Sequence, residues 1–390
     1  MLRSNSHLLA SFGALMSIVQ ISFSRGNDII EPGQISKEHI AGPLTDHFLQ
    51  WLKKNGYADD DFAYAHMGTQ ASFGGKFLDN DKLNHYPVIF IHGNSDGAMN
   101  ANYAAANPSD EGWSASISEF LQNGYTSAEL YAVTYGDREL KNSLHRTMDC
   151  ETVIRLRRFV TAVLAYTNSS YVDIVSHSMG VSFARRLIKG GHLIEPSEES
   201  ATKVNSVEGE VARFNECYIG EPIHHKIHTF IGIAGANYGM CFCSSEETEK
   251  AIPACGKRNG FWPGSCNAID DHLSECLSPN IDAALKCGAD HQYSSFLKNL
   301  NKDSIKEAKF IVSMWSDGDE IIGKTNLAWG RKTSLIPQSD KHVGLKDSLF
   351  GSMKKKDEAK ITPKNYYLII RLIGRLIQRD KRSVDFEYPH

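Results

Sequence analysis

The chain has 390 residues, of which 41% are hydrophobic and 23% are charged, a composition typical of globular proteins. This length allows one large domain or two modest ones, each with a substantial core. The formal net charge is −4 at pH 7 and the sequence contains no basic stripe, so nothing in the charge favours a nucleic-acid partner.

The N-terminus has the pattern of a secretory signal peptide. Arg3 supplies positive charge, an apolar run covers residues 8–23, and small residues stand at Ser22 and Ser24. The run is short for a membrane span and is interrupted by serine and glycine, which favours cleavage after Ser24 over an uncleaved anchor. We therefore expect a signal peptide at residues 1–24 and a secreted, extracellular protein with no transmembrane segment in the mature chain.

Short β-like runs alternate with helical runs after about residue 83. This alternation predicts an α/β fold with a mostly parallel central sheet and helices on both faces. Residues 25–82 are expected to pack on this main domain, which covers residues 83–390. Strands are predicted at residues 88–92, 129–135, 171–175, 228–234 and 309–315, and helices at residues 113–122, 150–166 with Asp149 as N-cap, after Ser178, and at about 363–379.

Two segments interrupt the alternation, at about residues 191–226 and 237–301. Both are expected to be insertions on the α/β frame. The second holds six cysteines and the stretch "GFWPG" at residues 260–264. It forms either a lid over the site or a disulfide-stabilised segment with no role toward substrate, and the sequence leaves both possibilities open.

The number and position of the cysteines predict disulfides. Eight cysteines follow a signal peptide, and seven of them lie between residues 217 and 287. Seven cannot pair among themselves, so if all are oxidised within the chain, one pairs with Cys150. A zinc site is disfavoured because paired Cys-x-x-Cys motifs are absent from the sequence. The cysteines are Cys150, Cys217, Cys241, Cys243, Cys255, Cys266, Cys276 and Cys287.

One N-glycosylation sequon, Asn168-Ser169-Ser170, lies just before the predicted strand at residues 171–175. In an open parallel sheet, this end of the strand is remote from the ligand-binding edge. A glycan at Asn168 would therefore leave a site at the opposite edge accessible.

The stretch "YVDIVSHSMG" at residues 171–180 places Ser178 where a strand turns sharply into a helix. A serine at such a turn projects its hydroxyl above the carboxyl edge of the sheet, and the crowded backbone requires small residues two positions away on each side. Ser176 and Gly180 meet this requirement, although the usual residue at the first position is glycine. The alternative is a serine that caps the following helix.

A loop upstream of Ser178 supports the catalytic interpretation. The strand in "PVIFIHGN" ends in His92-Gly93, as expected for the loop that donates one oxyanion-hole N–H. The backbone N–H groups of Asn94 and Met179 are therefore the predicted oxyanion-hole donors. The alternative is a simple turn at the end of the strand.

The order of a triad in this kind of fold is Ser, then Asp or Glu, then His. Acidic residues Asp317, Asp319 and Glu320 follow the strand that ends at residue 315, and we choose Asp319, with Asp317 second. Only His342 and the terminal His390 come later. A residue at the extreme end of a chain is poorly placed for a preorganised site, so His342 is the predicted general base.

These residues together predict nucleophilic catalysis. His342 takes the proton of Ser178, which attacks an acyl carbon, and Asp319 orients the histidine and stabilises its charged form. The N–H groups of Asn94 and Met179 stabilise the oxyanion, and water then hydrolyses the acyl-enzyme. The reaction requires no metal and no organic cofactor.

The motifs "PVIFIHGN", "VSHSMG", "SDGDEII" and "KHVGL" resemble those of the class 2 triacylglycerol lipases, a group within the α/β-hydrolase superfamily. The resemblance extends from about residue 87 to residue 345 and implies hydrolysis of lipid acyl esters, with a lipid ester or a lipid interface as partner. It does not include the cysteine-rich insertion or the first eighty or so residues.

Two alternatives to a triacylglycerol lipase remain open at this point. The first is a catalytically silent, secreted lipid-binding protein. The second is a hydrolase of the same mechanism that acts on a phospholipid, a small soluble ester or a peptide. The presence of all three triad residues and of the His-Gly loop argues against the silent protein.

Overall fold

The computed structural model describes eight parts of the chain: residues 40, 42–100, 112–196, 214–264, 272–278, 293–319, 321–323 and 325–345. The predicted signal peptide, the predicted helix at about 363–379, and Cys266, Cys287 and Glu320 lie outside these residues, as do parts of residues 25–82 and of both insertions. No helix among the described residues has the length and apolarity needed to cross a bilayer.

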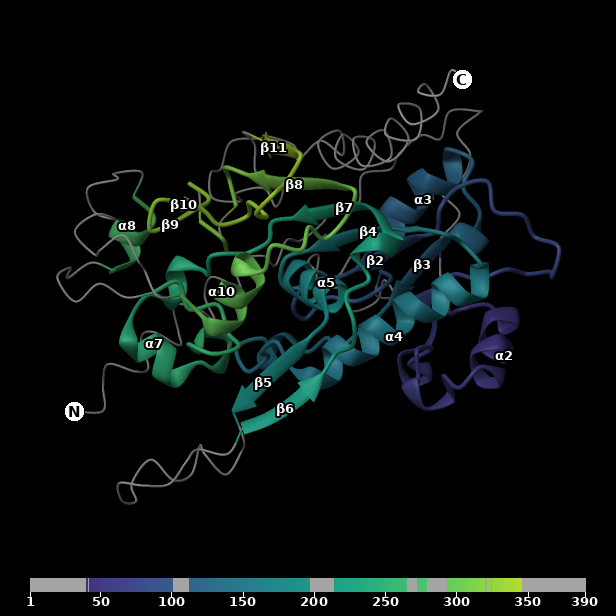
Figure 1. Ribbon diagram of the computed structural model, residues 1–390, viewed down its shortest axis with the longest axis horizontal. Helices are drawn as coiled ribbons and strands as arrows, with labels where there is room; N and C mark the ends of the chain where they lie inside the picture. The colour runs from purple at the N-terminus through teal and green to yellow at the C-terminus, as the bar shows by residue number, and fades with distance from the viewer. Residues whose placement is uncertain are drawn as a thin grey trace, which may run out of the picture.

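Seven strands form one sheet in the order β1-β3-β2-β4-β7-β8-β11 (Figure 1). Only the β1–β3 pair is antiparallel in this sheet of the described residues. The mostly parallel α/β fold is therefore confirmed. The strands are β1 (Ser72–Phe73), β2 (Val88–Ile91), β3 (Leu130–Val133), β4 (Val172–His177), β7 (Ile227–Ile233), β8 (Phe310–Ser316) and β11 (Lys341–Leu345).

The central strands are covered on both faces. All residues of β2, β3 and β7 are buried, which is why these strands read as continuous apolar runs rather than as alternating ones. Right-handed crossovers place α4 and α5 on one face and α3 on the other, because the chain moves in opposite directions along the sheet (Figure 1). The helices are α2 (Asp46–Lys54), α3 (Ser114–Gln122), α4 (Cys150–Thr167), α5 (Met179–Lys189) and α10 (Ser295–Lys302).

Several predicted boundaries are confirmed and others are wrong. Asp149 caps α4 as predicted and accepts a hydrogen bond from the N–H of Thr152. The strand predicted at residues 129–135 is shorter, because Glu129 closes a capping box with Thr126 and belongs to a short 3-10 helix. Strands β1 and β11, at the two edges of the sheet, were not predicted.

The two segments predicted to be insertions differ in structure. The first carries a two-stranded antiparallel hairpin, and the second is a series of short helices after β7 that Figure 1 places together with a small hairpin beyond the sheet. Their elements are β5 (His192–Pro196) and β6 (Phe214–Tyr218), then α7 (Glu246–Ala251) and α8 (His272–Cys276). The small hairpin that lies with the second insertion is β9 (Leu327–Ala328) and β10 (Arg331–Lys332).

Three disulfides join described residues: Cys150–Cys217, Cys241–Cys276 and Cys243–Cys255. The predicted reach of one later cysteine back to Cys150 is confirmed. It ties the hairpin strand β6, rather than the second insertion, to the first residue of α4.

A buried ionic network fixes the helix that follows Ser178. Arg185 on α5 has no exposed side-chain surface and donates to the carboxylate of Glu307 at 2.7 Å. It also donates to the side-chain oxygens of Asn237 and Asn301, the latter on α10. A buried guanidinium needs all of these acceptors because its desolvation is costly. The network therefore holds α5 in one position against α10.

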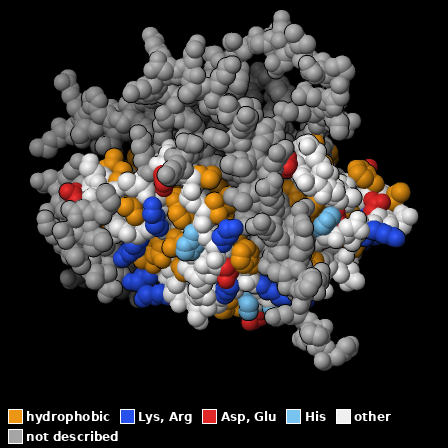
Figure 2. Space-filling model, turned by 90° about the horizontal axis from the view of Figure 1, so that it is seen from above, with side chains coloured by type: hydrophobic (Ala, Val, Ile, Leu, Met, Phe, Trp, Pro, Cys, Tyr) orange, Lys and Arg blue, Asp and Glu red, His pale blue; other side chains and the backbone are white. Residues whose placement is uncertain are grey.

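The surface described in Figure 2 mixes apolar and charged side chains of both signs on one face. On the part of this face that the structure describes, neither positive nor negative side chains predominate. This agrees with the small net charge of the sequence.

Candidate active site

Ser178 occupies a sharp turn between β4 and α5. Its backbone has φ 52° and ψ −126°, in the left-handed half of the φ range that residues other than glycine rarely adopt. Residues held in this way cluster at functional sites. The Ser178 side chain makes no capping hydrogen bond to α5, so helix capping does not account for the serine. The geometry fits a nucleophile raised above the carboxyl edge of the sheet.

The two small residues flanking this turn have separate physical reasons. A Cβ atom on Gly180 would lie 2.2 Å from the carbonyl oxygen of His92, so the helix approaches β2 as closely as backbones allow. Ser176 is fully buried between β2 and β7. Its hydroxyl donates to the carbonyl oxygen of Ile231 at 3.3 Å, and this bond satisfies the hydroxyl in a position where glycine is usual.

The predicted oxyanion loop lies directly against the turn. A Cβ atom on Gly93 would be 3.0 Å from both the Cβ of Ser178 and the Nδ1 of His177. Asn94 follows Gly93, and Met179 is the first residue of α5, whose N–H has no partner within the helix. The two predicted donor residues therefore flank Ser178 in space, although Asn94 and Met179 are far apart in sequence.

His92 sets the orientation of the oxyanion loop. Its Nε2 accepts a hydrogen bond from the backbone N–H of Tyr135 at 3.0 Å, so the ring proton is assigned to Nδ1. Nδ1 donates to the carbonyl oxygen of Gly93 at 2.7 Å. Because a peptide group is planar, fixing the carbonyl of Gly93 also fixes the direction of the Asn94 N–H. The Tyr135 ring stacks on His92, with centroids 4.0 Å apart.

The Asn94 side chain is held by the loop after β3. Its amide nitrogen donates to the carbonyl oxygen of Ser143 at 2.8 Å, and its oxygen accepts from Arg146 at 3.0 Å. Arg146 also contacts Ser95 and Asp137. Sequence reasoning did not identify Arg146 or assign His92 a role of its own. The "His-Gly" dipeptide was a signal for His92, whereas Arg146 stands in no motif.

The acid loop follows β8 at the same edge of the sheet. Asp319 is 4% exposed, and its Oδ1 accepts hydrogen bonds from the N–H groups of Ile321 and Ile322, both at 2.9 Å. Asp317 is exposed and accepts from the indole N–H of Trp315 at 3.3 Å. The buried, backbone-held Asp319 is the better preorganised of the two carboxylates.

Ser178 and Asp319 emerge from strands separated by one strand, β7. Two strand spacings amount to about 10 Å. Such a gap between the two strand ends would accommodate an imidazole between hydroxyl and carboxylate, which is the arrangement that a triad requires.

His342 does not occupy that gap. It is the second residue of the edge strand β11 and is exposed. In the sheet, His342 lies opposite Ser313 of β8. Ser313 lies opposite Gly232 of β7, and Gly232 lies opposite Ser176 of β4. Three strand spacings of about 4.8 Å place the His342 backbone about 14 Å from Ser176 along this row. The structure thus brings Ser178, Asn94 and Met179 together and puts Asp319 at the same edge, but it leaves His342 apart from them.

Two buried imidazoles next to the turn are neutral at pH 7. Loss of hydration lowers the pKa of His92 to about 3, and the nearby Arg138 and Arg146 lower it further, against the hydrogen bond to Gly93. Loss of hydration also lowers the pKa of His177 to about 4, although the residue keeps some exposed surface. Desolvation also lowers the pKa of Arg146.

In the described part of the chain, no three His, Cys, Asp or Glu residues cluster as metal ligands would.

The model of one protein family, described as "Lipase (class 2)", matches residues 85–361, well over half of the chain. A search of curated proteins finds no match.

Solved structures with a similar chain path come from several organisms. Mouse alpha/beta hydrolase domain-containing protein 10 is 16% identical, with a TM-score of 0.35, over 79% of this chain and 92% of that one. A monoacylglycerol lipase from Paleococcus ferrophilus is 12% identical, with a TM-score of 0.36, over 78% and 96%. The mature lipase BlEst2 from Bacillus licheniformis is 12% identical, with a TM-score of 0.36, over 77% and 97%.

We predict that the protein becomes less stable as the pH is lowered, because His92 and His177 are neutral in the folded state. An unfolded histidine takes up a proton below its pKa of about 6.5, whereas the folded rings do so only near 3 and 4. Acidification therefore favours the unfolded state, and the loss begins near pH 6.5. Between pH 7 and pH 5.5 the two rings together reduce the unfolding free energy by about 2–3 kcal/mol.

Urea unfolding at the two pH values measures this effect. His92→Gln should remove about half of the pH-dependent loss, since one of the two rings no longer titrates. His145→Gln, a change at an exposed position, is the control and should leave the loss as in the wild type. An unchanged pH dependence in His92→Gln would contradict the assignment.

Proposed function

The chain belongs to the class 2 lipase family, and we propose that this carboxylic ester hydrolase is a secreted triacylglycerol lipase that works through an acyl-enzyme. The observation that carries the proposal is Ser178, held at positive φ between β4 and α5 and in contact with the His92-Gly93 loop. A serine in this setting, with backbone N–H donors beside it, is suited to attack an ester carbonyl.

In the proposed reaction, the Ser178 hydroxyl attacks the ester carbonyl carbon while a base takes its proton. The oxyanion that forms accepts hydrogen bonds from the N–H groups of Asn94 and Met179. Collapse of this intermediate releases the alcohol, which receives the proton from the base. Water then attacks the acyl-enzyme by the same route and releases the fatty acid.

His342 is the proposed general base, and Asp319 is the proposed carboxylate that orients it. Because β11 lies three strands away from β4, the proposal requires the chain around His342 to shift so that its imidazole reaches the space between Ser178 and Asp319. Two features support this. β11 pairs only with β8 among the described strands, and its residues alternate between half-buried and exposed. His342 is also the only histidine between Asp319 and residue 345.

A lipid interface is the proposed site of action. Among the exposed large apolar side chains, Leu140, Ile321 and Leu273 lie on segments near the carboxyl edge of the sheet. They belong to the loop after β3, the acid loop and α8. Apolar side chains around a site favour contact with lipid.

Secretion is supported by three disulfides among the described residues and by the exposed Asn168 of the sequon. Asn168 ends α4 just before β4, at the edge of the sheet opposite Ser178. A glycan there would not obstruct substrate, as the sequence led us to expect.

Labelling with a fluorophosphonate tests the nucleophile. The wild type should be labelled, because the reagent reacts with an activated serine, and Ser178→Ala should not. Ser182→Ala changes a fully buried serine on α5, the helix that follows Ser178; it is the matched control and should be labelled like the wild type. An unlabelled wild type would instead support the silent lipid-binding protein.

Replacement of His342 tests the base. His342→Gln should lower kcat on a soluble ester by roughly 10²–10⁴-fold, since the serine then lacks its proton acceptor. His145→Gln is the control and should keep wild-type kcat. Added imidazole should restore part of the activity of His342→Gln. Near-normal turnover by this variant would show that another group is the base.

Ester chain length tests the substrate class. The rate on long-chain acylglycerols should rise once they exceed their solubility limit, and Leu140→Ser should lower this rate by roughly threefold or more, because less apolar surface meets the lipid. The rate on a short soluble ester should not change. Phe77→Ser is the matched control, as Phe77 is 72% exposed on the loop beyond β1, away from the acid loop. Activity confined to soluble esters would favour an esterase.

A further inference from the structure

We infer that the Cys241–Cys276 disulfide positions Asp319, the proposed carboxylate of the triad, and that it does so through the chain segment at residues 323–334, of which the structure describes residues 323 and 325–334. The inference rests on the proposed role of Asp319. It also addresses the choice between a lid and a segment with no role toward substrate for the cysteine-rich insertion, because it gives part of that insertion a direct mechanical link to the site.

The first contact joins the acid loop to the residue beside the disulfide. A Cβ atom on Gly323 would lie 2.3 Å from the Cδ2 of Leu277, so the chain four residues after Asp319 is packed tightly on Leu277. The hydroxyl of Thr325 donates to the carbonyl oxygen of Leu277 at 2.8 Å. Leu277 directly follows Cys276, and movement of one therefore displaces the other.

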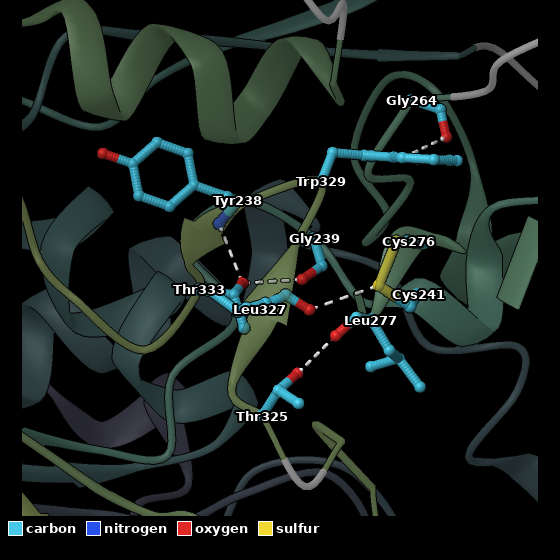
Figure 3. The surroundings of a disulfide bond; sticks show 10 residues. All are labelled: Tyr238, Gly239, Cys241, Gly264, Cys276, Leu277, Thr325, Leu327, Trp329 and Thr333. Atoms are coloured by element: carbon cyan, nitrogen blue, oxygen red, sulfur yellow. Dashed lines mark hydrogen bonds between the residues drawn. A yellow bond between two sulfur atoms is a disulfide. The ribbon is translucent and has the colours of Figure 1, made fainter. Parts of the chain in front are cut away.

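The second contact joins the β9–β10 hairpin to the disulfide itself (Figure 3). The backbone N–H of Trp329 donates to the carbonyl oxygen of Cys276 at 2.9 Å, and its indole N–H donates to that of Gly264 at 3.2 Å. Trp329 is 2% exposed. It packs with Cys241, Cys276 and Ala328 in a small apolar cluster that is separate from the main core. The hairpin is thus held on the cysteine-rich insertion.

The third contact comes from the chain after β7. The backbone N–H of Asn237 donates to the carbonyl oxygen of Thr333 at 2.7 Å. The Thr333 hydroxyl donates to the carbonyl oxygen of Gly239 at 2.7 Å (Figure 3). The Sγ of Cys241 lies 3.2 Å from the carbonyl oxygen of Leu327. A disulfide sulfur carries no proton, so this is a packing contact.

These contacts place the segment at residues 323–334 between two strips of chain that the disulfide joins. One strip is residues 237–241 and the other is residues 276–277. The carboxylate of Asp319 is fixed by the N–H groups of Ile321 and Ile322, which directly precede this segment. Loosening the segment therefore changes the position of the carboxylate, and small misplacements of catalytic groups have large effects on rate.

The Cys243–Cys255 disulfide provides a matched comparison in the same insertion. Both of its cysteines pack in the main hydrophobic core. Their backbone N–H groups donate to the carbonyl oxygens of Met240 and Ile252. Among the described contacts, none joins this disulfide to residues 323–334.

The test removes each disulfide by paired Cys→Ser changes and measures kcat and KM on a soluble ester, below the unfolding temperature of every variant. Cys241→Ser/Cys276→Ser should lower kcat about tenfold or more, with KM within about twofold of the wild type. Cys243→Ser/Cys255→Ser should keep kcat within about twofold. Equal losses in the two variants would overturn the inference, since they would reflect general destabilisation.

A double-mutant cycle gives the readout that a purely structural role would not move. In an Asp319→Asn background, removing Cys241–Cys276 should slow Ser178 labelling no further, because the disulfide acts through the carboxylate. Additive losses would overturn the inference while leaving the proposed function intact. If Asp319→Asn alone keeps wild-type rates, Asp319 is not the triad carboxylate and the inference fails, whereas labelling of Ser178 in the wild type still supports the proposed function.

Leu277→Ala provides a second route if the Cys→Ser pair does not fold. It keeps the disulfide and removes the packing against Gly323. It should lower kcat in the same direction and should likewise have no further effect on Ser178 labelling in the Asp319→Asn background. Wild-type kcat in a folded Leu277→Ala variant would overturn the inference.

Discussion

The close approach of α5 to the end of β2 is the constraint on which the site depends. No side chain fits at position 180, because a Cβ atom there would meet the carbonyl oxygen of His92 at 2.2 Å. The same approach brings the oxyanion loop against Ser178 and holds that residue at positive φ. One backbone contact thus places Ser178, the proposed nucleophile, beside both predicted N–H donor residues, while the buried Arg185 network fixes the far part of the helix.

What the sequence predicted well was local. The strand and helix around Ser178 and the Asp149 cap depend on short-range patterns, which are readable without the fold. β11 was missed because "KHVGL" contains a lysine, a histidine and a glycine and shows no β-branched run. Its pairing with β8 is a tertiary effect, and it places His342 within an edge strand of the sheet.

Disulfide connectivity also lay beyond the sequence. Parity required a partner for Cys150, but the choice of Cys217 depends on the β5–β6 hairpin lying beside α4, which only the fold determines. In the same way, His92 was visible as half of a dipeptide, whereas its ring tautomer and its hold on the Gly93 carbonyl follow from Tyr135, far away in sequence. Long-range polar contacts of this kind leave no periodic signal.

The Cys150–Cys217 disulfide has a consequence for how the molecule comes apart. It closes a covalent ring across a sequence separation of 67, and this ring contains all of α4, β4 and α5, with Ser178 inside it. By the chain-entropy model, such a ring raises the free energy of the unfolded chain by about 4 kcal/mol. Partial unfolding is therefore expected to begin in the parts of the sheet outside the ring, with the serine turn among the last elements to open.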